Sequence, residues 1–176
     1  MRILITGGAG SGKSAFAESL AMGQAGPRCY IAAMKPYGQE GERRITRHRS
    51  LRAGKGFATI ERYTNMDSLI LPRGGTALLE CLCNLTANEM FGDDGVERDS
   101  QSVFAKVTRG QDALAERLGA LIQVTNEVGG DTGGYPDGTA RYIQLLGRIN
   151  RALAERADIV YEMVCGIPVR LKGAGA

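Results

Sequence analysis

Eight consecutive residues near the amino terminus have the types and spacing needed to bind a polyphosphate. They follow a short apolar run and precede a helix-forming run, and they are Gly7, Gly8, Ala9, Gly10, Ser11, Gly12, Lys13 and Ser14. This pattern is typical of a Walker A loop, in which backbone N–H groups surround the phosphates because glycines leave no Cβ in the way. A glycine-rich turn without a ligand is the alternative, and the complete pattern between strand and helix disfavours it. The chain is therefore predicted to bind a nucleoside triphosphate.

Two side chains of this loop have separate roles in the prediction. Lys13 offers a compact positive charge to the β- and γ-phosphates, and the amino end of the following helix adds a partial positive charge. The hydroxyl of Ser14 is a ligand for Mg²⁺. A third residue, Glu80, ends the apolar run 76–80, and a carboxylate at a strand end in a P-loop fold faces the phosphates. We therefore expect Ser14 and Glu80 to bind the Mg²⁺ that accompanies ATP or GTP, although an ordinary acid at a strand end is the simpler interpretation of Glu80.

The only histidine of the chain, His48, lies in a strongly basic segment, residues 43–52. On a helix, Arg44, His48 and Arg52 would share a face, because they are four residues apart. Guanidinium groups near an imidazole favour its neutral form and attract phosphates. A neutral imidazole beside a nucleotide can attack phosphorus and form a phosphoramidate. A solvated basic helix with an incidental histidine explains the same spacing, and the spacing alone favours that simpler interpretation.

The elements that must position these residues alternate between strands and helices. This alternation predicts an α/β fold in one domain, residues 1–176, with a mainly parallel sheet. Strands are expected at 1–6, 29–33, 57–61, 76–80 and 121–125, with a final strand pair divided at 166–168. Helices are expected from 15 onward and at 39–52, 67–71, 82–91, 101–118 and 139–157, with loops at 92–99 and 129–138.

Composition indicates an ordinary globular protein. The 176 residues are 43% hydrophobic and 23% charged, and the net charge of +3 is too small to argue for a nucleic-acid partner. The first apolar run is too short for a signal peptide, and no run approaches the length of a membrane span. The cysteines lie in or beside apolar runs and are expected to be buried free thiols, which suits a cytoplasmic location; they are Cys29, Cys81, Cys83 and Cys165.

Taken together, these segments resemble the bifunctional adenosylcobinamide kinase / adenosylcobinamide-phosphate guanylyltransferase family of cobalamin biosynthesis and salvage. The resemblance runs from Ile3 to Lys172. Many proteins share the Walker loop, whereas its ordered combination with Val-Thr-Asn-Glu-Val-Gly and Gly-Arg-Ile-Asn is far more specific. The segments that carry the resemblance are 5–14, 30–32, 44–48 with Arg52, 57–61, 78–82 with Asn88, 124–129, 147–150 and 166–172.

The resemblance implies functions that the residue pattern alone does not. Adenosylcobinamide would be phosphorylated with ATP or GTP, and GMP would then pass from GTP through a covalent intermediate on His48 to give adenosylcobinamide-GDP. The resemblance also implies a RecA-like P-loop fold with helices on both faces of the sheet, and a homotrimer. It places further nucleotide contacts, largely through main chain, at Arg49, Ser50, Leu51 and Arg52, and it matches Glu61 and Glu80 to the family's pair of acidic nucleotide-binding residues.

The chain departs from the family pattern at several positions. Ala33 and Met34 stand where a hydroxyl residue is usual, the segment between Pro136 and Gly147 is shorter, and Arg151 replaces a common glutamine. These differences leave open an altered substrate preference or the loss of one activity. Two other functions also remain open, namely a P-loop small-molecule kinase without a covalent step and a nucleotide-binding module. Asn126 and Glu127 are either structural or functional, and we leave them out of the predicted catalytic set.

Overall fold

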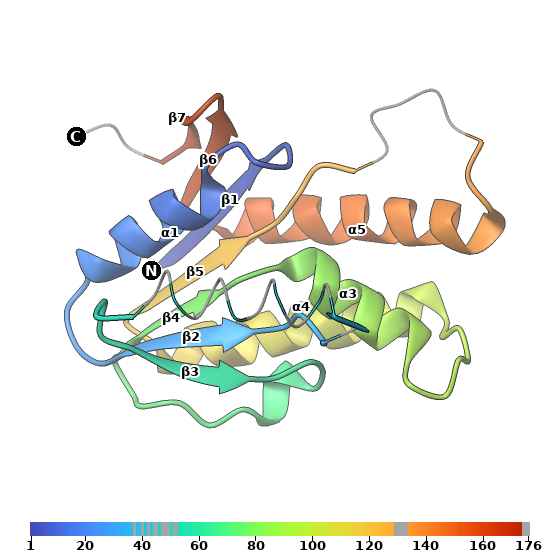
Figure 1. Cartoon of the computed structure of the whole chain (residues 1–176), viewed down its shortest axis with the longest axis horizontal. Helices are drawn as coiled ribbons and strands as arrows, with labels where there is room; N and C mark the ends of the chain where they lie inside the picture. The colour runs from blue at the N-terminus through green and yellow to red at the C-terminus, as the bar shows by residue number, and fades with distance from the viewer. Residues whose placement is uncertain are drawn as a thin grey trace.

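The computed structural model describes residues 1–36, 38, 39, 41, 43, 46, 50, 53–128 and 134–173. These residues form a seven-stranded sheet in the order β3-β2-β4-β5-β1-β6-β7, in which only β7 is antiparallel to its neighbour (Figure 1). The strands are β1 (Arg2–Gly7), β2 (Arg28–Ala32), β3 (Phe57–Glu61), β4 (Thr76–Leu79), β5 (Ala120–Val124), β6 (Ile159–Val164) and β7 (Ile167–Lys172). The helices are α1 (Lys13–Met22), the 3₁₀ helix η1 (Met66–Ser68), α3 (Leu82–Phe91), α4 (Ser100–Arg117) and α5 (Asp137–Arg156).

Helices cover both faces of the sheet, as predicted. Figure 1 shows α1 on one face and α3, α4 and α5 on the other. The central strands are apolar on both sides, which is the pattern of a parallel sheet buried between helix layers. In β1, Ile3 and Ile5 belong to the apolar cluster that includes Ala17 and Ala21 of α1, whereas Leu4 belongs to the cluster on the opposite face. The predicted α/β class with a mainly parallel sheet is confirmed.

The long helices form because their apolar residues recur at helical spacing. Val103, Val107 and Leu114 are the buried stripe of α4, and they pack with apolar residues of α3 and α5 against the sheet. The start of α4 is set by Asp99, whose carboxylate accepts a hydrogen bond from the Ser102 amide at 2.8 Å. The predicted helix at 82–91 coincides with α3. No helix in the described part of the chain is long and apolar enough to cross a membrane.

Several predicted boundaries are wrong. The helix expected at 67–71 is only the 3₁₀ turn η1, and α5 begins at Asp137 rather than 139. The turn expected at 166–168 lies at Cys165 and Gly166, both of which have positive φ, so Pro168 falls inside β7. Proline is tolerated there because β7 is an edge strand. Most of the helix expected at 39–52, and residues 129–133 of the predicted glycine-rich loop, lie outside the described residues.

We predict that Gly119→Ala destabilises the fold. The amide of Gly119 donates to Gly75 O at 2.9 Å, and this turn contact leaves no space for a side chain. A Cβ on Gly119 would lie 2.5 Å from the carbonyl oxygen of Gly74. Overpacking of this kind costs about 2 kcal/mol, which a urea unfolding curve would measure as a lower midpoint.

The matched control is Gly147→Ala on the exposed side of α5, where a Cβ would have no neighbour within 4 Å. Because alanine favours the helical state, this variant should gain about 0.5–1 kcal/mol. Equal urea midpoints for the two variants would show that the close contact between Gly119 and Gly74 does not constrain the fold.

Candidate active site

The loop after β1 has a backbone conformation that requires glycine. Gly10 and Gly12 have φ values of 71° and 93°, which side chains with a Cβ rarely adopt. Gly7 has a φ of 137°, and a Cβ there would lie 2.6 Å from the carbonyl oxygen of Met163 in β6. The loop therefore combines left-handed turns with a close approach to the neighbouring strand, and α1 starts directly from it at Lys13. This is the strand–loop–helix arrangement in which backbone N–H groups bind phosphate.

Lys13 is buried against the loop that it would serve. Its ammonium donates to Gly7 O at 2.8 Å and to Gly8 O at 2.6 Å. Burial lowers the pKa of Lys13 from its ordinary value, while the nearby Cys83, Cys81 and Glu127 act in the opposite direction. A phosphate that enters the loop offers charge-assisted hydrogen bonds that are stronger than those to the two carbonyl groups. The Lys13 ammonium is thus placed to replace its hydrogen bonds to Gly7 O and Gly8 O with hydrogen bonds to phosphate oxygens.

A cavity of about 420 Å³ lies over this loop, and the carboxyl ends of four parallel strands form its walls. Ligand sites of α/β proteins are expected at this edge of the sheet. The structure brings Ser14 and Glu80, the two predicted Mg²⁺ ligands, to the same cavity. Their hydroxyl and carboxylate oxygens are the donor types that Mg²⁺ accepts. The lining residues are Ala9, Gly10, Ser11, Gly12, Lys13, Ser14, Ala15, Met34, Glu80, Cys81, Asn84, Val124 and Asn126.

Other predicted site residues do not line this cavity. Glu61 is exposed at the end of β3, an edge strand, and its carboxylate accepts a hydrogen bond from the Tyr63 hydroxyl at 3.0 Å. Ser50 is also exposed, and its hydroxyl donates to Thr46 O at 3.0 Å. The residues His48, Arg49, Leu51 and Arg52 lie outside the described part of the chain.

The carboxyl-terminal flank of the His48 segment is attached to the helix of the phosphate loop. The ammonium of Lys55 lies 2.5 Å from a carboxylate oxygen of Glu18. Glu18 belongs to α1 and is 6% exposed, whereas the Lys55 side chain is 34% exposed, so this ion pair is half-buried. Lys55, which follows the basic segment in the chain, therefore lies beside α1, the helix that begins at Lys13.

A polar network fixes α5 to the end of β5 beside the cavity. The Thr125 hydroxyl donates to Asn150 Oδ1 at 2.7 Å, and Asn150 Nδ2 donates to Asn126 O at 3.2 Å. The Thr6 hydroxyl donates to Glu127 Oε1 at 3.4 Å, close to the accepted limit for a hydrogen bond. Asn126 thus lines the cavity and is also anchored to α5 through its carbonyl oxygen.

Some cavity residues were not predicted as site residues, among them Met34, Cys81 and Asn84. Met34 follows the end of β2, while Cys81 and Asn84 follow the end of β4. Their position directly after apolar runs is the signal that could have identified them, because parallel strands direct their carboxyl ends to one edge. Which of these strands are neighbours is not visible in the sequence.

The two thiols next to the cavity interact with each other. A hydrogen bond from the Cys81 thiol lowers the pKa of Cys83, and the same bond together with burial raises the pKa of Cys81. Cys81 also caps α3, since its sulfur accepts from the Asn84 amide at 3.4 Å. All four cysteines are free, as predicted. Burial is confirmed for Cys29 and Cys83, whereas Cys81 is half-buried and the prediction is wrong for Cys165, which is exposed in the β6–β7 turn.

Comparisons with known proteins identify the family to which the chain is similar. The family model described as cobinamide kinase / cobinamide phosphate guanyltransferase matches residues 3–171. The bifunctional adenosylcobalamin biosynthesis protein CobU of Salmonella typhimurium is 36% identical over 98% of this chain and 100% of its own length, and that of Escherichia coli is 34% identical with the same coverage. The bifunctional adenosylcobalamin biosynthesis protein CobP of Pseudomonas aeruginosa is 35% identical over 98% of both chains.

A solved structure supports the fold alone. An ATPase from the type III secretion system of pathogenic bacteria superposes with a TM-score of 0.57 at 12% identity. The superposition covers 93% of this chain but only 51% of the ATPase, so the chain spans about half of that protein. At this level of identity the likeness shows a shared architecture, in keeping with the glycine loop at the end of β1.

We predict that Lys13→Ala weakens triphosphate binding. Removal of a charged hydrogen-bond donor should lower the affinity for GTP by about 10- to 100-fold, and calorimetric titration would measure the change. Lys172→Ala is the matched control, because its ammonium bonds to Ala154 O and Glu155 O rather than lining the cavity. An unchanged affinity in the Lys13 variant would contradict the assignment of the phosphate site.

Proposed function

The chain belongs to the cobinamide kinase / cobinamide phosphate guanyltransferase family, and from this membership we propose that it catalyses both reactions of that name. Adenosylcobinamide is the proposed phosphoryl acceptor, ATP or GTP the donor, and GTP the source of the GMP group. The observation that carries the proposal is the cavity over the glycine loop, in which Lys13, Ser14 and Glu80 meet. The proposed location is the cytoplasm, which the four free cysteines support.

In the kinase reaction, the loop binds the triphosphate and orients its γ-phosphorus. A hydroxyl oxygen of adenosylcobinamide attacks that phosphorus, the bond to the β-phosphate oxygen breaks, the nucleoside diphosphate leaves, and the hydroxyl proton is released to water. The backbone N–H groups and Lys13 stabilise the charge on the transferred group. Ser14 and Glu80 would hold Mg²⁺, which would supply positive charge to offset that of the phosphates.

In the guanylyl transfer, His48 is the proposed nucleophile. Its imidazole nitrogen attacks the α-phosphorus of GTP, pyrophosphate leaves, and a phosphoramidate forms. The phosphate oxygen of adenosylcobinamide phosphate then attacks the same phosphorus, His48 leaves, and adenosylcobinamide-GDP results. Arg49 and Arg52 reduce the repulsion between the two anionic reactants, and with Ser50 and Leu51 they complete the proposed contacts to GTP. Two features support this assignment, namely the arginine-rich sequence around the only histidine and the ion pair by which Lys55, which follows that sequence, contacts Glu18 of α1.

We predict that His48→Ala abolishes acid-labile labelling of the protein by α-labelled GTP. ATP-dependent phosphorylation of adenosylcobinamide should stay within about two-fold, because the loop that binds the γ-phosphate is intact. Intact-mass spectrometry after incubation with GTP and Mg²⁺ measures the adduct. Gln39→Ala is the control, since it alters an exposed residue of the same part of the chain.

The outcomes separate the remaining alternatives. Labelling that persists in the His48 variant would exclude this histidine as the nucleophile. A wild-type chain that phosphorylates its substrate without becoming labelled would be a P-loop small-molecule kinase. If GTP binds but neither diphosphate nor pyrophosphate is released, the chain is a nucleotide-binding module.

We also propose that the chain assembles as a homotrimer, as the family resemblance implies, and that its β7 edge forms the contact between subunits. Ile167, Val169 and Leu171 alternate along β7 and therefore share one face, where they are 65%, 41% and 58% exposed. An exposed apolar edge strand invites pairing with another chain, and natural proteins usually cover it. The β7 strand is the last in the sheet order (Figure 1).

Light scattering should therefore give three times the chain mass of 18.8 kDa. The variant Leu171→Lys should shift the mass toward that of one chain, because a buried charge without a partner is costly in an interface. Ile70→Lys is the control, since Ile70 is 84% exposed and lies outside β7. A trimer that tolerates Leu171→Lys would place the subunit contact elsewhere.

A further inference from the structure

The ends of β2 and β3 are joined by a side chain of α3. The last backbone hydrogen bond between the two chain segments runs from Arg62 N to Ala32 O at 3.0 Å. One residue further on, Asn88 Nδ2 donates to Ala33 O at 2.8 Å and to Tyr63 O at 3.1 Å. The amide nitrogen carries two hydrogens, so both of its donors are used. Asn88 therefore continues the connection between β2 and β3 beyond the point where their own pairing stops.

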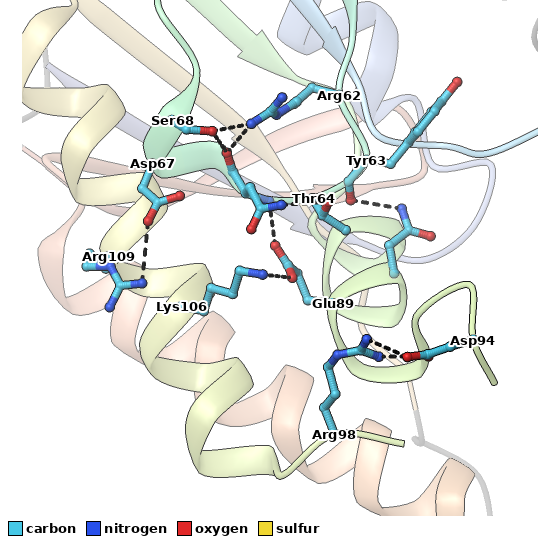
Figure 2. Close-up of polar contacts among 12 residues, drawn as sticks. Arg62, Tyr63, Thr64, Asp67, Ser68, Glu89, Asp94, Arg98, Lys106 and Arg109 are labelled. Atoms are coloured by element: carbon cyan, nitrogen blue, oxygen red, sulfur yellow. Dashed lines mark hydrogen bonds and ion pairs between the residues drawn. The ribbon is translucent and has the colours of Figure 1, made fainter. Parts of the chain in front are cut away.

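The next residue of α3 fixes the same segment at a second point. Glu89 is 4% exposed, its Oε1 accepts from the Asn65 amide at 2.6 Å, and its Oε2 lies 2.7 Å from Lys106 Nζ of α4 (Figure 2). Asn65 has a φ of 55°, a left-handed conformation that a non-glycine residue adopts only with support. Both carboxylate oxygens are satisfied, which makes this a buried, fully paired anchor.

The two joined segments lead to different parts of the proposed nucleotide site. Ala33 precedes Met34, which lines the phosphate cavity. Tyr63 lies two residues after Glu61, and its hydroxyl donates to the Glu61 carboxylate. In the sheet order β3-β2-β4, β3 lies roughly 10 Å from β4, the strand after which the cavity residue Glu80 follows. If the phosphates of a nucleotide bind the glycine loop and its nucleoside lies at Glu61, the nucleotide passes over the end of β2, because β2 lies between β3 and β4. Asn88 is bonded to this end of β2.

We propose that Asn88 is a positioning residue for the nucleoside half of the bound nucleotide. Its amide sets the spacing between the Ala33–Met34 wall of the cavity and the Glu61–Tyr63 strand end. Phosphate affinity then depends on the glycine loop, whereas the added affinity from base and ribose depends on Asn88. This inference rests on the proposed function, in which Glu61 contacts GTP. No residue of the phosphate loop takes part in it, so the two contributions are separable by experiment.

The test compares GTP with inorganic tripolyphosphate, both with Mg²⁺, in calorimetric titrations of the full chain. Asn88→Ala should lower the affinity for GTP by about 10-fold and leave that for tripolyphosphate within about two-fold. Asn88→Asp should lose more, because a carboxylate would face two carbonyl oxygens. Asn88→Ser retains one donor, disturbs the fold less, and should give an intermediate loss of GTP affinity.

Thr86→Val is the matched control from the same helix. Thr86 is fully buried, and its hydroxyl has no hydrogen-bond partner among the described residues, so both affinities should stay unchanged. If the Asn88 variants bind both ligands as the wild type does, or lose affinity for both equally, the positioning role is wrong. If the wild-type chain binds GTP no more tightly than tripolyphosphate, the proposed function fails together with this inference, whatever the variants do.

Discussion

The parallel pairing of β2, β4, β5 and β1 is the constraint on which the site depends. Parallel strands direct their carboxyl ends to one edge, so residues that follow four separate strands meet above the glycine loop. Lys13, Glu80 and Asn126 are far apart in the chain and contact one cavity only for this reason. The chemistry is consequently concentrated at one edge of the sheet, while the faces of the sheet are left to apolar packing.

The helices do more than cover that sheet. At the carboxyl edge, polar side chains from α3 and α5 reach the strand ends, where backbone groups would otherwise lack partners. Asn150 of α5 binds the end of β5, and Asn88 of α3 binds the ends of both β2 and β3. Each helix thus joins an apolar stripe in the core to a polar contact beside the site. Packing of the core and geometry of the site are coupled through these side chains.

The elements were predictable where local patterns are strong. The strand at 57–61 and the helix at 82–91 were predicted with their observed bounds, because alternation and helical spacing are local properties. The turn before β7 was misplaced, since Pro168 is acceptable only in an edge strand, and edge position is a property of the whole sheet. Cys165 was expected to be buried because apolar residues surround it in the sequence. It is exposed because it lies in the turn of the β6–β7 hairpin at the edge of the sheet.

The sequence by itself determined the phosphate loop. Gly10, Gly12 and Lys13 act within a few residues of chain, and their spacing specifies the turn without reference to the rest of the fold. Only the tertiary structure decided which other residues join them. Asn84 lines the cavity because β4 lies between β2 and β5, and Asn88 joins two strand ends because β2 lies beside β3. Strand order is set by long-range pairing and burial that no local period encodes.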